Sequence, residues 1–267
     1  MAYTPSFDGT RLYYETVGSG EPLLLISGQG ADRHGWDVVR DDFARKHLVV
    51  TWDHRGTGDS EKPREPAYTI EMFARDALAI LDALGIGRAH IYGTSMGGRI
   101  AQRLAISHRE RVGAVVLGCT TPGNRMGVRR PPEVDAQMAN RPSSPEQAAR
   151  QLCSQMVSAG FARAHPEYLE TLLERYRNPI PGFARRLHYA ASEGHDAWDD
   201  LPGITAPVLV IHGDDDTVNV TANAYLLAER IPGAGLHIVE GGRHGYWVEF
   251  RQETSAAVLE FLECHPL

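Results

Sequence analysis

Short apolar runs alternate with longer amphipathic segments along the chain. Asp8-Gly9 lies between the runs Tyr3–Phe7 and Arg11–Val17 and predicts a β-hairpin. Apolar runs typical of strands covered on both faces follow at Pro22–Ser27, Leu48–Trp52, Ala89–Gly93, Val112–Gly118, Pro207–His212 and Gly235–Val239. Between them apolar residues recur at helical spacing, most clearly over Ile70–Leu84. This alternation predicts an α/β fold with a mostly parallel, doubly wound sheet.

The stretch from Pro122 to about Trp198 departs from this alternation. It has no convincing buried strand and carries amphipathic helical pieces such as Pro145–Ala159 and Pro166–Arg177, separated by prolines. A long irregular loop is uncommon at this length. We therefore expect a core formed by residues 1–121 and 200–267, and a helical cap formed by residues 122–199 over one end of the sheet.

The pentapeptide Gly93-Thr94-Ser95-Met96-Gly97 matches the pattern G-x-S-x-G. It lies between a predicted strand and the helical run Met96–Ile106. A sharp turn from a strand into a helix is the position at which this motif presents a nucleophilic serine. The flanking glycines relieve crowding at that strained turn. The backbone N–H of Met96 would lie at a helix N-terminus, where it can donate to a developing oxyanion. We interpret Ser95 as a nucleophile.

A serine hydroxyl is a weak nucleophile without a base, and the base must itself be oriented. In a doubly wound sheet, groups that follow different strands meet at the carboxyl edge. Two polar loops qualify, Gly213–Thr217 after one predicted strand and Glu240–Gly245 after the last. The chain order Ser, Asp, His is the one expected for this kind of turn.

From the hairpin to the C-terminal helix, the chain resembles the α/β-hydrolases. Besides the serine pentapeptide, the similarity lies in a D-x-R-G-x-G-x-S loop at residues 53–60, in Gly213-x-x-Asp216 and in Gly242-Arg243-His244. Three further segments are most similar to the small lactonase and esterase branch, which includes 3-oxoadipate enol-lactonase-like proteins: Gly28-Gln29, Gly118–Pro122 and Ser95–Arg99.

The resemblance implies the α/β-hydrolase fold with a helical cap insertion. Position by position, it implies Ser95 as nucleophile, His244 as general base and Asp216 as the carboxylate that orients the base. It also implies an oxyanion hole formed by the backbone N–H groups of Gln29 and Met96.

One position departs from the family pattern. The loop after the strand Leu23–Ile26 begins Ser27-Gly28, where the family usually has His-Gly. A backbone donor can survive this change. The histidine that commonly braces the loop is absent, so the rigidity of the loop is in question.

The acid has two rivals in its own loop. Asp214 and Asp215 stand beside Asp216, and we expect them to cap the following helix. Cys119-Thr120-Thr121 occupies the position where some relatives keep their acid, so no carboxylate competes there.

The chain has 12 histidines, and His244 is the one that follows the last predicted strand in a glycine-lined loop. His54 belongs to a glycine-rich loop, where a structural role is favoured. Histidines on predicted strands are expected to be satisfied core residues, namely His90, His212 and His237. Those in helical or loop contexts are expected at the surface, namely His34, His47, His108, His165, His188, His195 and His265.

Gly28, Arg125 and Trp198 are candidate substrate-binding residues. Arg125, with Arg129 and Arg130, could clamp a substrate carboxylate, although a solvated charged face is the simpler interpretation. Trp198 could line a pocket or simply pack within the cap.

Composition excludes several classes of protein. The 267 residues are 42% hydrophobic and 23% charged, as in an ordinary soluble globular protein. The net charge of 27 − 34 = −7 argues against a nucleic-acid partner. No run reaches about 18 apolar residues, so no membrane partner is expected. Cys119, Cys153 and Cys264 form no CxxC motif and are expected to be reduced thiols in the cytoplasm.

Metal-binding and nucleotide-binding signatures are lacking. The sequence has no HExxH motif and no Cys/His cluster at ligand spacing. Gly18-x-Gly20 and Gly56-x-Gly58 are too short to cradle a phosphate. We predict no metal and no cofactor. The expected partner is a small-molecule substrate, and self-association into a homo-oligomer stays open.

These observations predict a serine hydrolase that cleaves a carboxylic ester or lactone through an acyl-enzyme intermediate. Several alternatives keep the same three residues: a carbon–carbon bond hydrolase, a perhydrolase, a biosynthetic cyclase, or a ligand-binding module with a slow or inactive triad. A serine at the turn argues against dehalogenases and epoxide hydrolases, which need a carboxylate nucleophile there.

Overall fold

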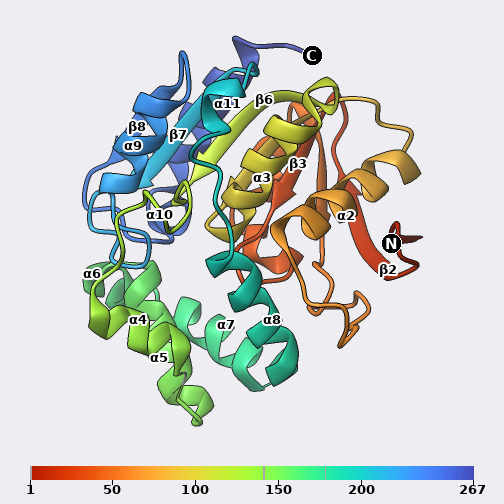
Figure 1. Ribbon diagram of the computed structural model, residues 1–267. Helices are drawn as coiled ribbons and strands as arrows, with labels where there is room; N and C mark the ends of the chain where they lie inside the picture. Colours follow the sequence, from red (N-terminus) through yellow and green to blue (C-terminus); the bar gives the residue numbers. More distant parts are fainter. Residues whose placement is uncertain (1, 141, 178) are drawn as a thin grey trace.

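A computed structural model describes residues 2–140, 142–177 and 179–267 (Figure 1). Its centre is an eight-stranded sheet of order β1-β2-β4-β3-β5-β6-β7-β8. The strands are β1 (Ala2–Pro5), β2 (Arg11–Val17), β3 (Glu21–Ile26), β4 (His47–Trp52), β5 (Ala89–Thr94), β6 (Val112–Gly118), β7 (Val208–Gly213) and β8 (Gly235–Val239).

Among the described strands, β2 alone runs opposite to the others. The hairpin β1–β2 is antiparallel, and β2 also pairs antiparallel with β4. From β4 to β8 all neighbouring strands are parallel. The loops that follow β3, β5, β6, β7 and β8 therefore leave the sheet at the same edge. The predicted doubly wound sheet and the strand positions are confirmed.

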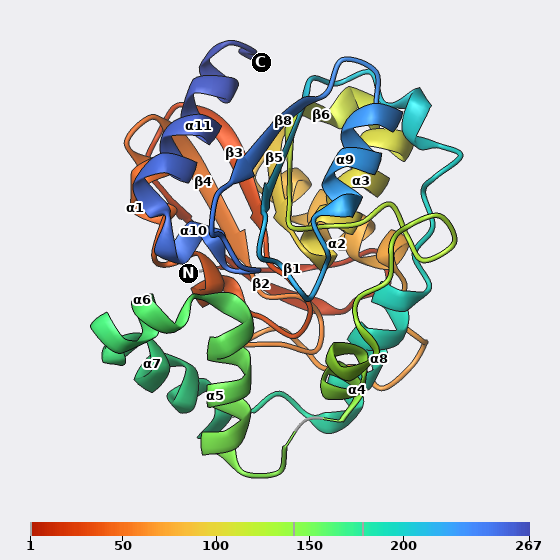
Figure 2. The ribbon, with the colours of Figure 1, turned by 90° about the vertical axis from the view of Figure 1, so that its left-hand side faces the viewer.

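Helices cover both faces of the sheet, as Figure 2 shows. One face is packed by α2 (Ile70–Ala83), α3 (Met96–Ser107) and α9 (Ala222–Arg230). The other is packed by α1 (Arg40–Ala44), α10 (Tyr246–Glu249) and α11 (Arg251–Glu263). Three short 3₁₀ helices lie in the described loops, at Arg33–Trp36, Arg109–Arg111 and Leu201–Gly203.

The segment between β6 and β7 is helical and lies at one end of the molecule, below the sheet in Figures 1 and 2. It contains α4 (Pro132–Ala139), α5 (Pro145–Met156), α6 (Ala159–Ala164), α7 (Pro166–Arg177) and α8 (Gly182–Glu193). A small apolar cluster of its own joins α5 and α7 through Ala149, Cys153, Val157 and Leu172. We call residues 122–199 the cap; whether it folds as a separate unit stays a prediction.

The single helix expected over Pro145–Ala159 is wrong in extent. Val157 is extended, and the Ser158 side chain accepts a hydrogen bond from the N–H of Phe161 and caps a new helix. A serine at an N-cap satisfies a backbone donor that has no partner inside the helix. The chain therefore turns between α5 and α6.

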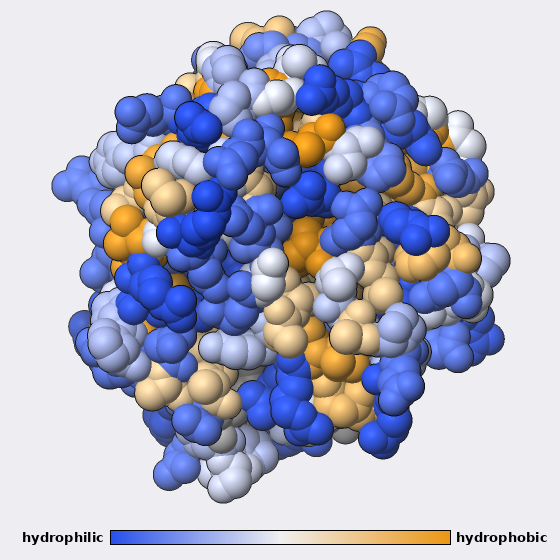
Figure 3. Space-filling view, in the orientation of Figure 1, coloured by the Kyte–Doolittle hydropathy of each residue, from blue (hydrophilic) through white to orange (hydrophobic). Residues whose placement is uncertain are grey.

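Polar residues dominate the face shown in Figure 3, with small apolar patches between them. Among the described residues, no helix is both long and apolar enough to cross a membrane.

The core predicts a large cost for truncation at the sheet centre. Leu24 on β3 is fully buried, so Leu24→Ala should lower the free energy of unfolding by about 2–5 kcal/mol. Leu236 on the edge strand β8 is 38% exposed, and Leu236→Ala should cost less than about 1 kcal/mol. Urea unfolding measures both; equal losses would contradict this assignment of the core.

Candidate active site

Ser95 lies on a strained turn between β5 and α3. Its backbone has φ 56° and ψ −117°, outside the regions that side-chain-bearing residues normally occupy. The turn is possible because glycines stand two residues before and two residues after Ser95. A Cβ on Gly93 would lie 2.1 Å from the carbonyl oxygen of Gly97, and a Cβ on Gly97 would lie 2.0 Å from that of Ile26 in β3.

Backbone contacts hold the turn against the neighbouring strand. The N–H of Ser95 donates to the Gly118 carbonyl at 2.9 Å, and the Thr120 hydroxyl donates to the Ser95 carbonyl at 2.7 Å. Met96 is the first residue of α3, so its N–H lies at a helix N-terminus, as expected. Ser95 is thus fixed at the carboxyl edge of the sheet.

Asp216 and His244 meet at this same edge, although 28 residues separate them. His244 Nδ1 lies 2.8 Å from Asp216 Oδ2. The other carboxylate oxygen, Oδ1, accepts the N–H groups of Val218 at 2.8 Å and Asn219 at 3.0 Å. A carboxylate accepts but cannot donate, so His244 carries its proton on Nδ1 and leaves Nε2 free to act as a base.

A second imidazole contacts the acid, and sequence analysis assigned it only a core role. His212 Nε2 lies 2.6 Å from the Asn219 carbonyl oxygen and 3.2 Å from Asp216 Oδ2. Burial alone would raise the pKa of the Asp216 carboxyl. The charge of His244 and the hydrogen bonds from His212 and His244 outweigh burial, and the pKa lies well below its usual range.

Asp214 and Asp215 do not cap the following helix, so that expectation is wrong. Asp214 accepts the N–H of Gly241 at 2.7 Å, and Asp215 pairs with the Arg243 side chain at 2.8 Å. Both side chains therefore tie the acid loop to the His244 loop. The nearest helix, α9, begins only at Ala222, because the chain first closes around the Asp216 carboxylate.

The loop that follows β3 passes directly beside the serine. A Cβ on Gly28 would lie 3.3 Å from Ser95 Cβ. The Gly28 carbonyl accepts the N–H of Ala31 at 3.2 Å. This bond orients the peptide that carries the Gln29 N–H, the predicted oxyanion donor.

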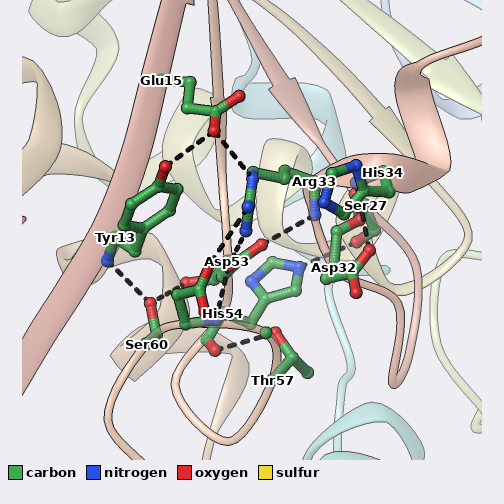
Figure 4. Close-up of polar contacts among 12 residues, drawn as sticks. Tyr13, Glu15, Ser27, Asp32, Arg33, His34, Asp53, His54, Thr57 and Ser60 are labelled. Atoms are coloured by element: carbon green, nitrogen blue, oxygen red, sulfur yellow. Dashed lines mark hydrogen bonds and ion pairs between the residues drawn. The ribbon is translucent and has the colours of Figure 1, made fainter. Parts of the chain in front are cut away.

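Both ends of this loop are anchored by Asp53 and His54, which follow β4 (Figure 4). His54 Nε2 lies 2.9 Å from the Ser27 carbonyl oxygen, and Asp53 Oδ1 accepts the Arg33 N–H at 2.9 Å. The Ser27 hydroxyl closes the loop by donating to the Asp32 carbonyl at 2.9 Å. The bracing that the missing histidine would supply thus comes from elsewhere in the chain.

Several histidines lie elsewhere than the sequence predicted. Three that were expected at the surface are buried: His47, His188 and His195. His237, expected in the core, is partly exposed, and its Nε2 lies 2.9 Å from the Glu253 carboxylate. It belongs to β8, an edge strand of the sheet, so one side of its strand has no neighbour to cover it.

His188 has the most consequential of these positions. It belongs to α8 and is fully buried against the loop of His54 and the loop of Gly30. The sequence of a cap helix does not show which of its faces meets the core. The expectation that His188 lies at the surface was therefore wrong.

The cap also holds the His244 loop. The N–H of His244 donates to the Gln155 carbonyl at 3.2 Å, and the N–H of Gly245 donates to the Met156 carbonyl at 2.8 Å. These carbonyls end α5, where helix carbonyls lack partners within the helix. The His244 loop is thereby positioned by the core and the cap together.

The structure places Arg125 in exposed ion pairs with Asp196 at 2.7 Å and Asp199 at 2.5 Å. Trp198 packs against the core, with the Arg230 guanidinium 5.0 Å from its ring centroid. Neither contact involves Ser95 or His244. Their roles, like that of Gly28, as substrate-binding residues stay predictions.

One group of described residues could present three metal ligands. Donor atoms of Cys119, Asp216 and His244 lie within 4.8 Å of one another. Asp216 and His244 are already hydrogen-bonded to each other. Burial raises the pKa of the Cys119 thiol well above its usual range, which disfavours the thiolate that binds metals. The residues present therefore fit a metal poorly, and the expectation of no metal stays a prediction.

An imidazole on a buried carboxylate, at the same sheet edge as a serine on a strained strand-to-helix turn, is the arrangement expected of hydrolases built on a parallel sheet. A family model described as "alpha/beta hydrolase fold" matches residues 21–250. The chain belongs to the α/β-hydrolase family and is an enzyme of it, as the motifs predicted.

Similar proteins are hydrolases of several kinds. The chain is 33% identical to a 2-hydroxy-6-oxononadienedioate/2-hydroxy-6-oxononatrienedioate hydrolase of Burkholderia vietnamiensis, covering 96% of this chain and 92% of that protein. It is 31% identical to 3-oxoadipate enol-lactonase 2 of Acinetobacter baylyi, covering 86% and 85%. A solved structure of an N-acyl homoserine lactone degrading enzyme superposes with a TM-score of 0.86 at 31% identity, covering 98% and 100%.

The geometry of the turn predicts that position 97 tolerates no side chain larger than that of glycine. A methyl group there would overlap the Ile26 carbonyl, a backbone atom that cannot rotate away. Gly97→Ala should lower the free energy of unfolding by at least about 2 kcal/mol and abolish labelling of Ser95 by a fluorophosphonate probe. A Cβ on Gly87 would meet no atom within 4 Å, so Gly87→Ala is the matched control. Normal labelling of Gly97→Ala would refute the steric argument.

Buried His188 predicts acid destabilisation. Burial lowers its pKa from 6.5 to about 4, so between these values the unfolded chain binds a proton that the folded chain does not. The free energy of unfolding should fall as the pH decreases through this window, by at most roughly 1.4 kcal/mol per pH unit for this group. His188→Phe should make the decline shallower in urea unfolding at a series of pH values; an unchanged slope would contradict the burial argument.

Proposed function

We propose that the protein is a serine hydrolase of carboxylic esters or lactones, with Ser95, His244 and Asp216 as its triad. The observation that carries the proposal is the 2.8 Å contact of His244 Nδ1 with the Asp216 carboxylate, at the same sheet edge as the strained Ser95. An imidazole oriented in this way is poised to accept a proton on Nε2.

The reaction proceeds in two halves. His244 Nε2 takes the Ser95 proton while Oγ attacks the substrate carbonyl carbon. Asp216 stabilises the imidazolium, and the N–H groups of Gln29 and Met96 donate to the tetrahedral oxyanion. His244 then protonates the alkoxide as it departs, and the acyl group stays bound to Ser95. A water activated by His244 releases the acid and restores the serine.

The low pKa of Asp216 supports this assignment of roles. A carboxylate that stays ionised can balance the imidazolium formed during each half-reaction. Three N–H groups point at its oxygens, from Val218, Asn219 and His244, and His212 Nε2 lies 3.2 Å from Oδ2. Asp214 and Asp215 are exposed and bond to the neighbouring His244 loop instead, which supports Asp216 as the acid.

A second candidate is favoured by the sequence comparison. The relative at 33% identity is named as a hydrolase of a 2-hydroxy-6-oxo dienedioate. Hydrolysis of a carbon–carbon bond in a substrate of that kind would use the same triad. A 2-hydroxy-6-oxo-dienoate therefore belongs in the substrate panel beside esters and lactones.

The triad predicts a large and specific loss on removal of the acid. Asp216→Asn should lower kcat by about 10⁴-fold, because the amide favours the wrong imidazole tautomer. Asp215→Asn, which alters an exposed pair with Arg243, should change kcat by less than about tenfold. Kinetics on p-nitrophenyl esters and small lactones, with Ser95→Ala in parallel, measure this.

The possible outcomes decide between the candidates. Sustained ester or lactone turnover that is lost in Ser95→Ala supports the proposal. Turnover of the dienoate alone favours carbon–carbon bond hydrolysis. Persistent fluorophosphonate labelling in Ser95→Ala, or equal losses in the two aspartate variants, would sink the triad; a stoichiometric burst without turnover would indicate a ligand-binding protein.

A further inference from the structure

Three successive peptide groups of the loop after β3 are held in place, and the middle one carries the Gln29 N–H. The peptide before it is fixed by His54, 2.9 Å from the Ser27 carbonyl oxygen. The peptide after it is fixed by His188, whose Nδ1 accepts the Gly30 N–H at 3.3 Å. The middle peptide is fixed by the bond from Ala31 to the Gly28 carbonyl. In a trans peptide the N–H points away from the C=O, so the direction of the Gln29 N–H is set.

The His188 imidazole must be neutral to do this, because its Nδ1 accepts a hydrogen bond. His188 Nε2 lies 2.8 Å from the Arg55 carbonyl oxygen. A carbonyl only accepts, so Nε2 carries the proton and Nδ1 offers its lone pair to Gly30. Burial lowers the pKa of His188 to about 4 and, with the nearby His188, lowers that of His54 to about 3. The bonding pattern is therefore kept at neutral pH.

The helix that carries His188 also contacts the helix that begins at Met96. Arg99 lies on α3, one turn after Ser95. Its Nη1 donates to two oxygens of Ser192, the backbone carbonyl and, at 2.8 Å, the hydroxyl. Ser192 lies four residues after His188, so both side chains project from one face of α8. Arg99 is only 3% exposed, and the carbonyl end of α8 offsets its charge. One cap helix thus joins α3 to the loop of Gln29.

We propose that His188 and His54 are positioning residues for the oxyanion hole, and that α8 is the brace that sets its two donors, the N–H groups of Gln29 and Met96, relative to each other. This proposal rests on the proposed serine mechanism. It assigns the cap a part in the chemistry of the core in addition to covering the sheet edge.

A packing role is the competing explanation. The His188 ring lies 5.0 Å from the Phe73 ring and 5.7 Å from the Tyr68 ring, centroid to centroid. Phenylalanine would keep these ring contacts but has no lone pair for Gly30 and no proton for Arg55. Glutamine loses the ring but keeps an acceptor and a donor. The two variants therefore separate hydrogen bonding from packing.

The test compares His188→Phe, His188→Gln and a control, His195→Phe. His195 is a buried cap histidine bonded to Gln102 at 3.2 Å, away from the oxyanion loop. Removal of an oxyanion donor costs about 10²–10³ in kcat, so a loosened donor in His188→Phe should cost about 10–100-fold. KM should stay within about threefold, because ground-state binding does not use the hole. His188→Gln should retain more activity than His188→Phe.

Two further readouts report on the hole itself. Affinity for a trifluoromethyl ketone, which forms a tetrahedral adduct with the serine, should fall in His188→Phe in parallel with kcat/KM. Hydrogen exchange of the peptide containing residues 27–32 should become faster in His188→Phe and stay unchanged in His195→Phe.

Each outcome has one meaning. An unchanged kcat in a folded His188→Phe variant, equal losses in the Phe and Gln variants, or an equal loss in His195→Phe would overturn the brace. If the wild-type protein neither labels at Ser95 nor turns over any substrate of the panel, the serine mechanism itself fails. Failure of the serine mechanism can be told apart from failure of the brace, because hydrogen exchange still tests whether His188 holds the loop.

Discussion

The first turn of α3 comes within van der Waals distance of the end of β3, and the rest of the site depends on that approach. A glycine at position 97 allows it, since any Cβ there would meet the Ile26 carbonyl. The same approach puts Ser95 beside Gly28, because the loop after β3 leaves the sheet where the turn arrives. Ser95 and the loop of Gln29 are therefore neighbours as a consequence of backbone packing between two adjacent parallel strands.

Asp216 and His244 are positioned by a different kind of contact. Asp216 and His244 follow β7 and β8, and backbone N–H groups and a second imidazole surround the carboxylate. A buried charge is tolerated because each oxygen accepts hydrogen bonds. Asp214 and Asp215 then link the two loops. Of the three neighbouring acids, one is the buried partner of His244 and two join the loops at the surface.

The cap takes part in both halves of the site. The end of α5 holds the His244 loop by backbone bonds, and α8 contacts the oxyanion loop through His188. The first contact uses carbonyls at the end of α5 that have no partner within the helix. The second uses the imidazole of His188, which burial keeps neutral. Together these contacts tie the cap to the loop of His244 and to the loop of Gln29, so under the proposed mechanism a change within the cap acts on both loops without contacting the substrate.

The sequence by itself determined the sheet, the strand-to-helix turn at the serine and the identity of the three candidate catalytic residues. Apolar runs of strand length, and a glycine on each side of Ser95, are local signals whose meaning does not depend on the remainder of the chain. Only the tertiary structure decided what His54, His188 and His212 do. Each looked like a surface, loop or core histidine, since a lone polar residue carries no mark of its partner. Their partners are backbone carbonyls, a backbone N–H and a carboxylate, brought to them by the packing of separate strands and of the cap, and long-range contacts of that kind leave no periodicity in the sequence.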